Sequence, residues 1–209
     1  MLDPIPLHTL SGAEALTPDG ADVLRFWQWA FSDLRSNVVR GVLAEFLVAR
    51  ALRADLSRPR VSWDNYDFVS AEGWKVEVKA SAYLQSWKQR RLSALSFSRL
   101  RGRIWDDETA QYIGQPEVRA DLFVFAVNTC QQPERYDVLD LHHWRFYPVR
   151  GVTVAAWNSD TVRLRLVEEV SSAVTWSNLA NAASAKMAEV SPNQGSAANA
   201  MRGGRQPTG

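Results

Sequence analysis

The sequence predicts an α/β fold in which a central mixed β-sheet is flanked by helices. Apolar residues follow a helical spacing up to about residue 53, and from Val61 they alternate with polar residues as in strands. Residues 121–127 then form a continuous apolar run, which is typical of a strand buried on both faces. Helical and strand patterns that alternate along one chain indicate layers of helix and sheet around one core.

Length and composition predict one domain over residues 1–190. The chain has 209 residues and a net charge of +1, so overall charge argues neither for nor against a polyanionic partner. From residue 191 to 209 only polar, small and Pro residues remain around one Met, and we expect this tail to be disordered.

Cysteine use and hydropathy indicate the compartment. Cys130 is the single cysteine, which excludes an intramolecular disulfide and a Cys-based zinc site. We therefore expect a reducing, cytoplasmic setting. No stretch reaches the roughly 18–20 apolar residues that span a bilayer, so a membrane is not an expected partner.

The expected elements follow from the same patterns. Ser36 is a candidate N-cap for a helix over 37–53. The expected strands are 61–70, 74–81, 92–98, 121–127 and 162–168, and a helix is expected over 176–189.

A hairpin around Ala71-Glu72-Gly73 brings two carboxylates to one face. A three-residue loop with Gly73 in the left-handed conformation sets Phe68 opposite Val76 and Asp67 opposite Glu77. A two-residue loop would instead bring Asp64 onto the Glu77 face. The position of Gly73 favours Asp67.

Glu77 and Lys79 lie on the same face of the second hairpin strand. Carboxylates placed directly opposite each other destabilise a sheet unless a cation lies between them, and Mg²⁺ prefers such oxygen ligands. The alternative is an ordinary solvated strand face, because charged residues often alternate with apolar ones on an open sheet.

Glu45 adds a third carboxylate from the helix over 37–53. It falls on a stripe formed by Val38, Val42, Ala49 and Leu52, so we expect it at the centre of the buried face. A buried Glu is costly unless it is paired or binds a metal. The alternative is a Glu at the core edge that is bound to an Arg or a backbone amide.

The ordered set of Glu45 on a helix, Asp67 on a strand and Glu77-Val78-Lys79 on the next strand resembles the PD-(D/E)XK nuclease superfamily of restriction-endonuclease-like proteins. The resemblance covers about residues 36–129. It implies a restriction-endonuclease-like core within a single nuclease-like domain.

The sequence departs from the family pattern at two places. Tyr66 stands where the family often has Pro before the Asp, and residues 99–118, where a core helix is implied, have a weak helical signal. The strand over 121–127 would supply the fourth core strand.

The resemblance also implies the roles of the site residues. Asp67, Glu77 and the carbonyl of Val78 would bind Mg²⁺, with Mn²⁺ as a substitute, and Glu45 would bind a water of that ion or a second ion. Lys79 would orient or help to deprotonate the attacking water and offset charge on the phosphate. The implied function is metal-dependent hydrolysis of phosphodiester bonds; the alternative is an inactive nucleic-acid-binding or assembly module on the same fold.

A basic segment follows the hairpin directly. Between Ala80 and Trp105 there is no acidic residue, although the segment contains six of the 24 Lys and Arg residues. These are Lys88, Arg90, Arg91, Arg99, Arg101 and Arg103. Such a segment favours phosphate contacts with nucleic acid, for which we expect DNA. The alternative is a solvated loop neutralised from elsewhere, and the oligomeric state, including a homodimer, stays open.

Overall fold

The computed structural model of the chain describes residues 8–16, 18, 20–60, 64–106 and 108–189. The α-helices are α1 Val23–Phe31, α2 Asn37–Ala51, α3 Gly151–Ala156, α4 Leu164–Glu168 and α5 Leu179–Ala188. The strands are β1 Phe68–Val69, β2 Lys75–Ala82, β3 Ser96–Ser98, β4 Gly102–Asp106, β5 Gln111–Glu117, β6 Leu122–Asn128, β7 Trp144–Arg150 and β8 Thr161–Arg163. Short 3-10 turns cover Pro133–Arg135, Leu141–His143 and Trp176–Asn178. The expected tail over 191–209 lies outside the described residues.

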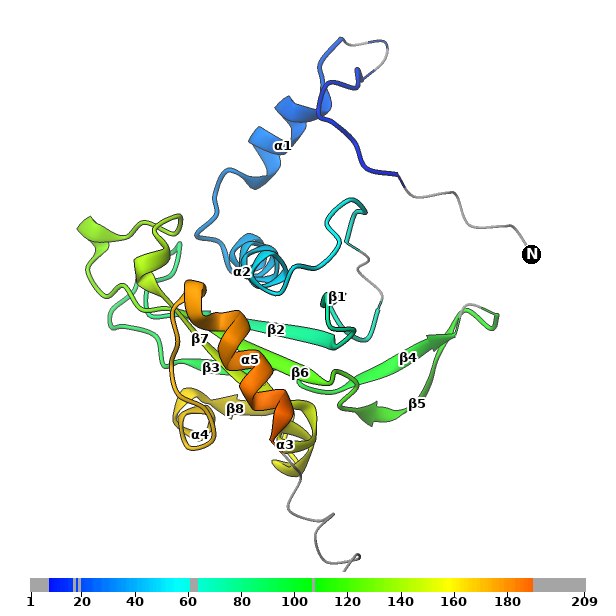
Figure 1. Cartoon of the computed structure of the whole chain (residues 1–209). Helices are drawn as coiled ribbons and strands as arrows, with labels where there is room; N and C mark the ends of the chain where they lie inside the picture. Colours follow the sequence, from blue (N-terminus) through cyan, green and yellow to red (C-terminus); the bar gives the residue numbers. More distant parts are fainter. Residues whose placement is uncertain (1–7, 17, 19, 61–63, 107, 190–209) are drawn as a thin grey trace, which may run out of the picture.

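The central sheet is mixed and has the order β1-β2-β6-β7 (Figure 1). β2 runs antiparallel to β1 and parallel to β6, and β6 runs antiparallel to β7. The fold is therefore α/β with a mixed sheet, as the sequence predicted, and β7 is the fourth strand of this sheet. β6 is buried along its whole length, which confirms the interpretation of the apolar run.

Two apolar layers cover the two faces of this sheet. On one face α2 and α5 pack on Val76, Val78 and the even-numbered residues of β6. On the other face β3, β8, α3 and α4 pack on Phe123, Phe125 and Val127 (Figure 1). None of the helices in the described ranges is long and apolar enough to cross a membrane.

Three of the expected strands differ in the structure. The strand expected over 61–70 is reduced to β1, with residues 64–67 in bends and 61–63 outside the described residues. The strand expected over 92–98 is shortened to β3, which pairs with β8 instead of joining the central sheet. The strand expected over 162–168 ends at Arg163 and continues as α4. Apolar and Arg residues alternate only from Val162 to Leu166, and so short a pattern does not distinguish strand from helix.

The connection between the parallel strands β2 and β6 contains no helix within its described residues. Residues 99–118, where the family resemblance implies a core helix, instead form the β4–β5 hairpin, which projects away from the sheet (Figure 1). Every residue of β5 is exposed, so this hairpin adds no layer to the core.

Gly151 marks a close approach at the start of α3. Its amide donates to the Asp121 carbonyl at 2.7 Å, and a Cβ built on it would lie 1.9 Å from the Ala120 carbonyl oxygen. We expect Gly151→Ala to lower the free energy of unfolding by about 2–3 kcal/mol, because the backbone must move to admit the methyl group. Gly41→Ala is the control: nothing lies within 4 Å of its added Cβ, so this variant should gain up to about 1 kcal/mol of helix stability. Urea unfolding of both variants measures the difference, and an unchanged Gly151→Ala would contradict it.

Candidate functional site

The hairpin has the register that Gly73 favours. Gly73 has φ +84°, and the amide of Ser70 donates to the Trp74 carbonyl at 2.9 Å. Phe68 is paired with Val76. This confirms the three-residue loop and sets Asp67 in the register position opposite Glu77.

Asp67 binds the edge of β2 just beyond the end of β1. Its amide donates to the Val76 carbonyl at 2.8 Å, and its carboxylate accepts the Val78 amide at 2.6 Å. The Asp67 side chain thus continues the hydrogen bonding of β2 where the neighbouring strand stops. This fixes the carboxylate at the sheet edge.

Glu77 and Lys79 lie on the face of β2 opposite to α2. Val76 and Val78 point into the layer under α2, so strand alternation turns Glu77 and Lys79 to the other face. Their side chains are only 17% and 19% exposed, and the Lys79 Nζ lies 2.5 Å from a Glu77 carboxylate oxygen. The pair is therefore a partly desolvated ion pair.

The acidic groups of the hairpin interact unfavourably with each other. Burial and the charge of Asp67 raise the pKa of Glu77 to about 7, although the charge and hydrogen bond of Lys79 oppose this shift. Burial also raises the pKa of Asp67, against the opposing effects of the Val78 amide and the charge of Lys79. Two carboxylates in this state gain stability from any additional cation placed between them.

Glu45 lies at the edge of the buried face of α2, not at its centre. The buried face is centred on Ala44, Leu47 and Val48, whereas Val38 is exposed, because these three residues pack against β2. The buried face of α2 is therefore rotated by about one residue from the stripe that the sequence predicted. The Glu45 side chain is 18% exposed.

Arg60 holds Glu45 in place. Its Nε and one terminal nitrogen lie 2.9 and 2.8 Å from the same Glu45 carboxylate oxygen. Burial and the charge of Asp67 raise the pKa of Glu45 to about 7, and Arg60 opposes the rise. The alternative of a core-edge Glu paired with an Arg thus describes the observed contact.

Three acidic residues approach the hairpin from different sides. Glu45 comes from the helix on one face, Glu77 is on the other face, and Asp67 lies at the edge between them. Across the ranges that the structure describes, no three His, Cys, Asp or Glu side chains are arranged to hold one metal ion. The donor set at the hairpin is therefore the pair of Asp67 and Glu77, with Lys79 beside it.

A cleft of about 240 Å³ opens at Glu77 and Lys79. It is lined by four arginines, by Tyr112 of the β4–β5 hairpin, and by Asp64, Asn65 and Glu117, of which Glu117 pairs with Arg119 at 3.0 Å. The arginines are Arg99, Arg101, Arg103 and Arg119.

The expected basic segment is divided in the structure. Arg99, Arg101 and Arg103 line this cleft, whereas Lys88, Arg90 and Arg91 lie on the loop that follows β2. Arg119 lies outside the basic segment of the sequence, because Asp106, Glu108 and Glu117 separate it from that segment. Its position just before the buried strand that pairs with β2 is the signal that would have identified it.

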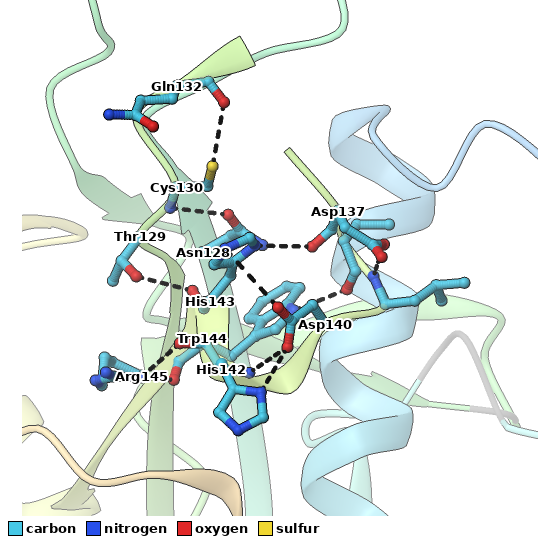
Figure 2. Close-up of polar contacts among 12 residues, drawn as sticks. Asn128, Thr129, Cys130, Gln132, Asp137, Asp140, His142, His143, Trp144 and Arg145 are labelled. Atoms are coloured by element: carbon cyan, nitrogen blue, oxygen red, sulfur yellow. Dashed lines mark hydrogen bonds and ion pairs between the residues drawn. The ribbon is translucent and has the colours of Figure 1, made fainter. Parts of the chain in front are cut away.

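Other polar residues of the chain have structural roles. The carboxylate of Asp121 accepts the Lys75 amide at 2.9 Å and so ties the start of β6 to the start of β2. Figure 2 shows His142 and His143 between β6 and β7, where their ring nitrogens contact Asp140 at 2.8 Å and the Asp137 carbonyl at 3.2 Å. Cys130 is buried beside them, and its thiol donates to the Gln132 carbonyl (Figure 2).

In comparisons with known proteins, no protein-family model and no curated protein matches the sequence.

Proposed function

We propose that this protein is a metal-dependent nuclease that hydrolyses phosphodiester bonds, with DNA as its substrate. The observation that carries the proposal is the ion pair of Glu77 and Lys79 at an arginine-lined cleft, with Asp67 bound to the same strand at the edge of the sheet. The cleft offers cations for phosphate oxygens directly beside Glu77, whose pKa is raised by burial and by the charge of Asp67.

The donor set fits a hydrated Mg²⁺ ion. Magnesium in phosphate-processing sites keeps several waters and takes only one or two carboxylates from the protein. Asp67 and Glu77 would hold it together with the carbonyl of Val78, and Mn²⁺ would substitute because it accepts the same oxygen ligands. Such an ion lowers the pKa of a bound water and stabilises negative charge on phosphoryl oxygens.

Other residues of the site would contact the attacking water and the phosphates of the substrate. Lys79, held by Glu77, would donate a hydrogen bond to the attacking water or to a phosphate oxygen. Arg99, Arg101 and Arg119 would bind the flanking phosphates along the cleft. Glu45 is tied to Arg60, so its role would be to add negative potential behind Asp67.

The resemblance to the PD-(D/E)XK superfamily supports the same proposal. The order of helix Glu, edge Asp and strand Glu-x-Lys is retained around a mixed sheet. A restriction-endonuclease-like core would differ here in one respect, since the β4–β5 hairpin replaces the implied helix in the crossover.

The second candidate function is an inactive nucleic-acid-binding module. The observation that favours it is that both Glu45 and Glu77 are already paired with Arg60 and Lys79 in the described arrangement. Such a module would bind DNA in a salt-dependent manner and would need no divalent ion.

Cleavage assays distinguish the two candidates. We expect the purified protein to cleave at least one of plasmid, linear or branched DNA in Mg²⁺ or Mn²⁺, and to lose this activity in EDTA. Asp67→Asn should lower the rate by at least about 100-fold. RNA substrates in parallel assign the class of nucleic acid. Absence of cleavage for every substrate, with retained DNA binding, would favour the binding module.

A further inference from the structure

A loop of residues 83–93, within the connection between β2 and β3, is folded by its own polar side chains. Its ends are closed by the Ser93 amide, which donates to the Tyr83 carbonyl at 3.0 Å. Inside the loop, the Gln89 side chain accepts the Gln85 amide at 2.7 Å and donates to Ser93 Oγ at 3.0 Å. We call this segment the Trp87 loop.

Arg40 anchors the Trp87 loop to α2. Its guanidinium group donates to Gln85 Oε1 at 3.1 Å and to the Arg35 carbonyl at 2.8 Å, and the residue is only 3% exposed. These hydrogen bonds hold Gln85 and Gln89 within the loop.

The outward side chains are one aromatic and three cations. Trp87 is 55% exposed, and Lys88, Arg90 and Arg91 are exposed beside it. Within the described part of the chain, no acidic side chain lies within ion-pair distance of these three cations. This arrangement offers an aromatic face for stacking and cations for phosphate groups on one surface.

These side chains line a hollow on each side of the loop. Toward α2, a cavity of about 500 Å³ also includes Arg35 and Tyr136. Asp33 pairs with Arg35 at 2.9 Å, while the buried Tyr136 hydroxyl has no hydrogen-bond partner among the described residues. Toward β8, a cavity of about 800 Å³ adds Arg163. No acidic residue lines either hollow.

The Trp87 loop lies at the other end of β2 from the cleft. Tyr83 is six positions beyond Glu77 in the sequence, which is roughly 20 Å of extended chain. That length corresponds to about six stacked nucleotides of one strand. A duplex conceals the faces of its bases, so Trp87 is accessible for stacking only to an unpaired base.

We propose that the Trp87 loop binds an unpaired segment of nucleic acid, with Trp87 stacking on a base and Lys88, Arg90 and Arg91 contacting phosphates. The proposal rests on the proposed function for the class of ligand and deepens it, since it assigns to the enzyme a substrate with a single-stranded portion. It does not require hydrolysis.

Fluorescence anisotropy of labelled oligonucleotides in EDTA tests the proposal without catalysis. We expect a 12-nucleotide single strand to bind more tightly than the matching duplex, and Trp87→Ala to weaken single-strand binding about tenfold. Trp87→Phe should retain most of the affinity, because Phe preserves the stacking face. Trp29→Ala is the matched control: Trp29 is 84% exposed on α1, away from the loop, and should be neutral.

Further measurements separate the outcomes. Lys88→Ala should reduce the dependence of log affinity on log salt by about 0.7, and affinity should rise with length up to at least about six nucleotides. Unchanged single-strand binding by Trp87→Ala would overturn the proposal, as would an equal loss of single-strand and duplex binding. The proposal would also be overturned if Trp87→Ala lost binding to anionic phospholipid vesicles but kept oligonucleotide binding, because the loop would then be a membrane contact. If the wild-type protein cleaves no substrate but Trp87→Ala loses single-strand binding, the nuclease proposal is refuted and the proposal for the Trp87 loop is supported.

Discussion

Replacement of Lys79 by Ala is expected to lower the rate of metal-dependent cleavage by about 100- to 10,000-fold. The Lys79 Nζ is the only described cation within ion-pair distance of Glu77. Its charge also acts to lower the pKa of Asp67, against the effect of burial. A cation held there is placed to donate to the water or phosphate oxygen, and such groups contribute on this scale to catalysis.

Lys75→Ala is the matched control for this variant. Lys75 is on the same strand and face as Lys79 but is exposed, with its ammonium group over the Tyr66 ring. It should keep most of the activity. The loss in Lys79→Ala should appear in kcat at saturating substrate and metal, with DNA affinity in EDTA almost unchanged. A variant that cleaves at the wild-type rate would remove Lys79 from the mechanism.

Replacement of Glu77 is expected to change the free energy of unfolding within a defined pH range. Glu77→Gln is expected to raise the free energy of unfolding by about 1–3 kcal/mol at pH 8 without divalent ions. The pKa of Glu77 is raised from 4.5 to about 7 by burial and by Asp67. Between these values the folded state keeps the proton that the unfolded state has released, so stability falls as pH rises. Gln resembles the protonated form and avoids this loss, so the two proteins should be equally stable near pH 4.

Glu72→Gln provides a control with the opposite sign. Glu72 is in the turn of the same hairpin; partial burial acts to raise its pKa, but the hydrogen bond and charge of Arg53 outweigh this and lower it. Its removal should slightly destabilise the protein at pH 8 and have no benefit at any pH. Thermal melts from pH 4 to 9 measure both variants.

Divalent ions should reverse the difference at Glu77. Binding of Mg²⁺ or Mn²⁺ to the folded state raises its stability by mass action, and wild type should gain more than Glu77→Gln, which lacks one carboxylate ligand. An equal gain in the two proteins would show that Glu77 does not bind the ion. A Glu77→Gln variant less stable than wild type at pH 8 in EDTA would contradict the electrostatic argument.

Several features of the site were predictable because they depend on neighbours in the sequence. Gly73 selects the loop length, and the loop length sets Phe68 opposite Val76. Ser36 caps α2 by accepting the Val39 amide. The apolar run over 121–127 predicted the buried strand β6.

Other features depended on contacts between distant segments. The edge of α2 on which Glu45 lies follows from how Ala44 and Val48 pack on β2, and its partner Arg60 lies across a loop. Arg119 reaches the cleft because β6 pairs with β2. The single basic segment became two surfaces because β3 lies between Arg91 and Arg99.

The sequence alone therefore determined the turn, the strand register and the carboxylate pair of Asp67 and Glu77 with Lys79, because local backbone preferences and alternation act over a few residues. Only the tertiary structure decided which face each charge occupies, that Glu45 is held by Arg60, and that four arginines surround the cleft. Those arrangements depend on which apolar faces are buried against each other, and the free energy of that burial is shared among residues far apart in the chain.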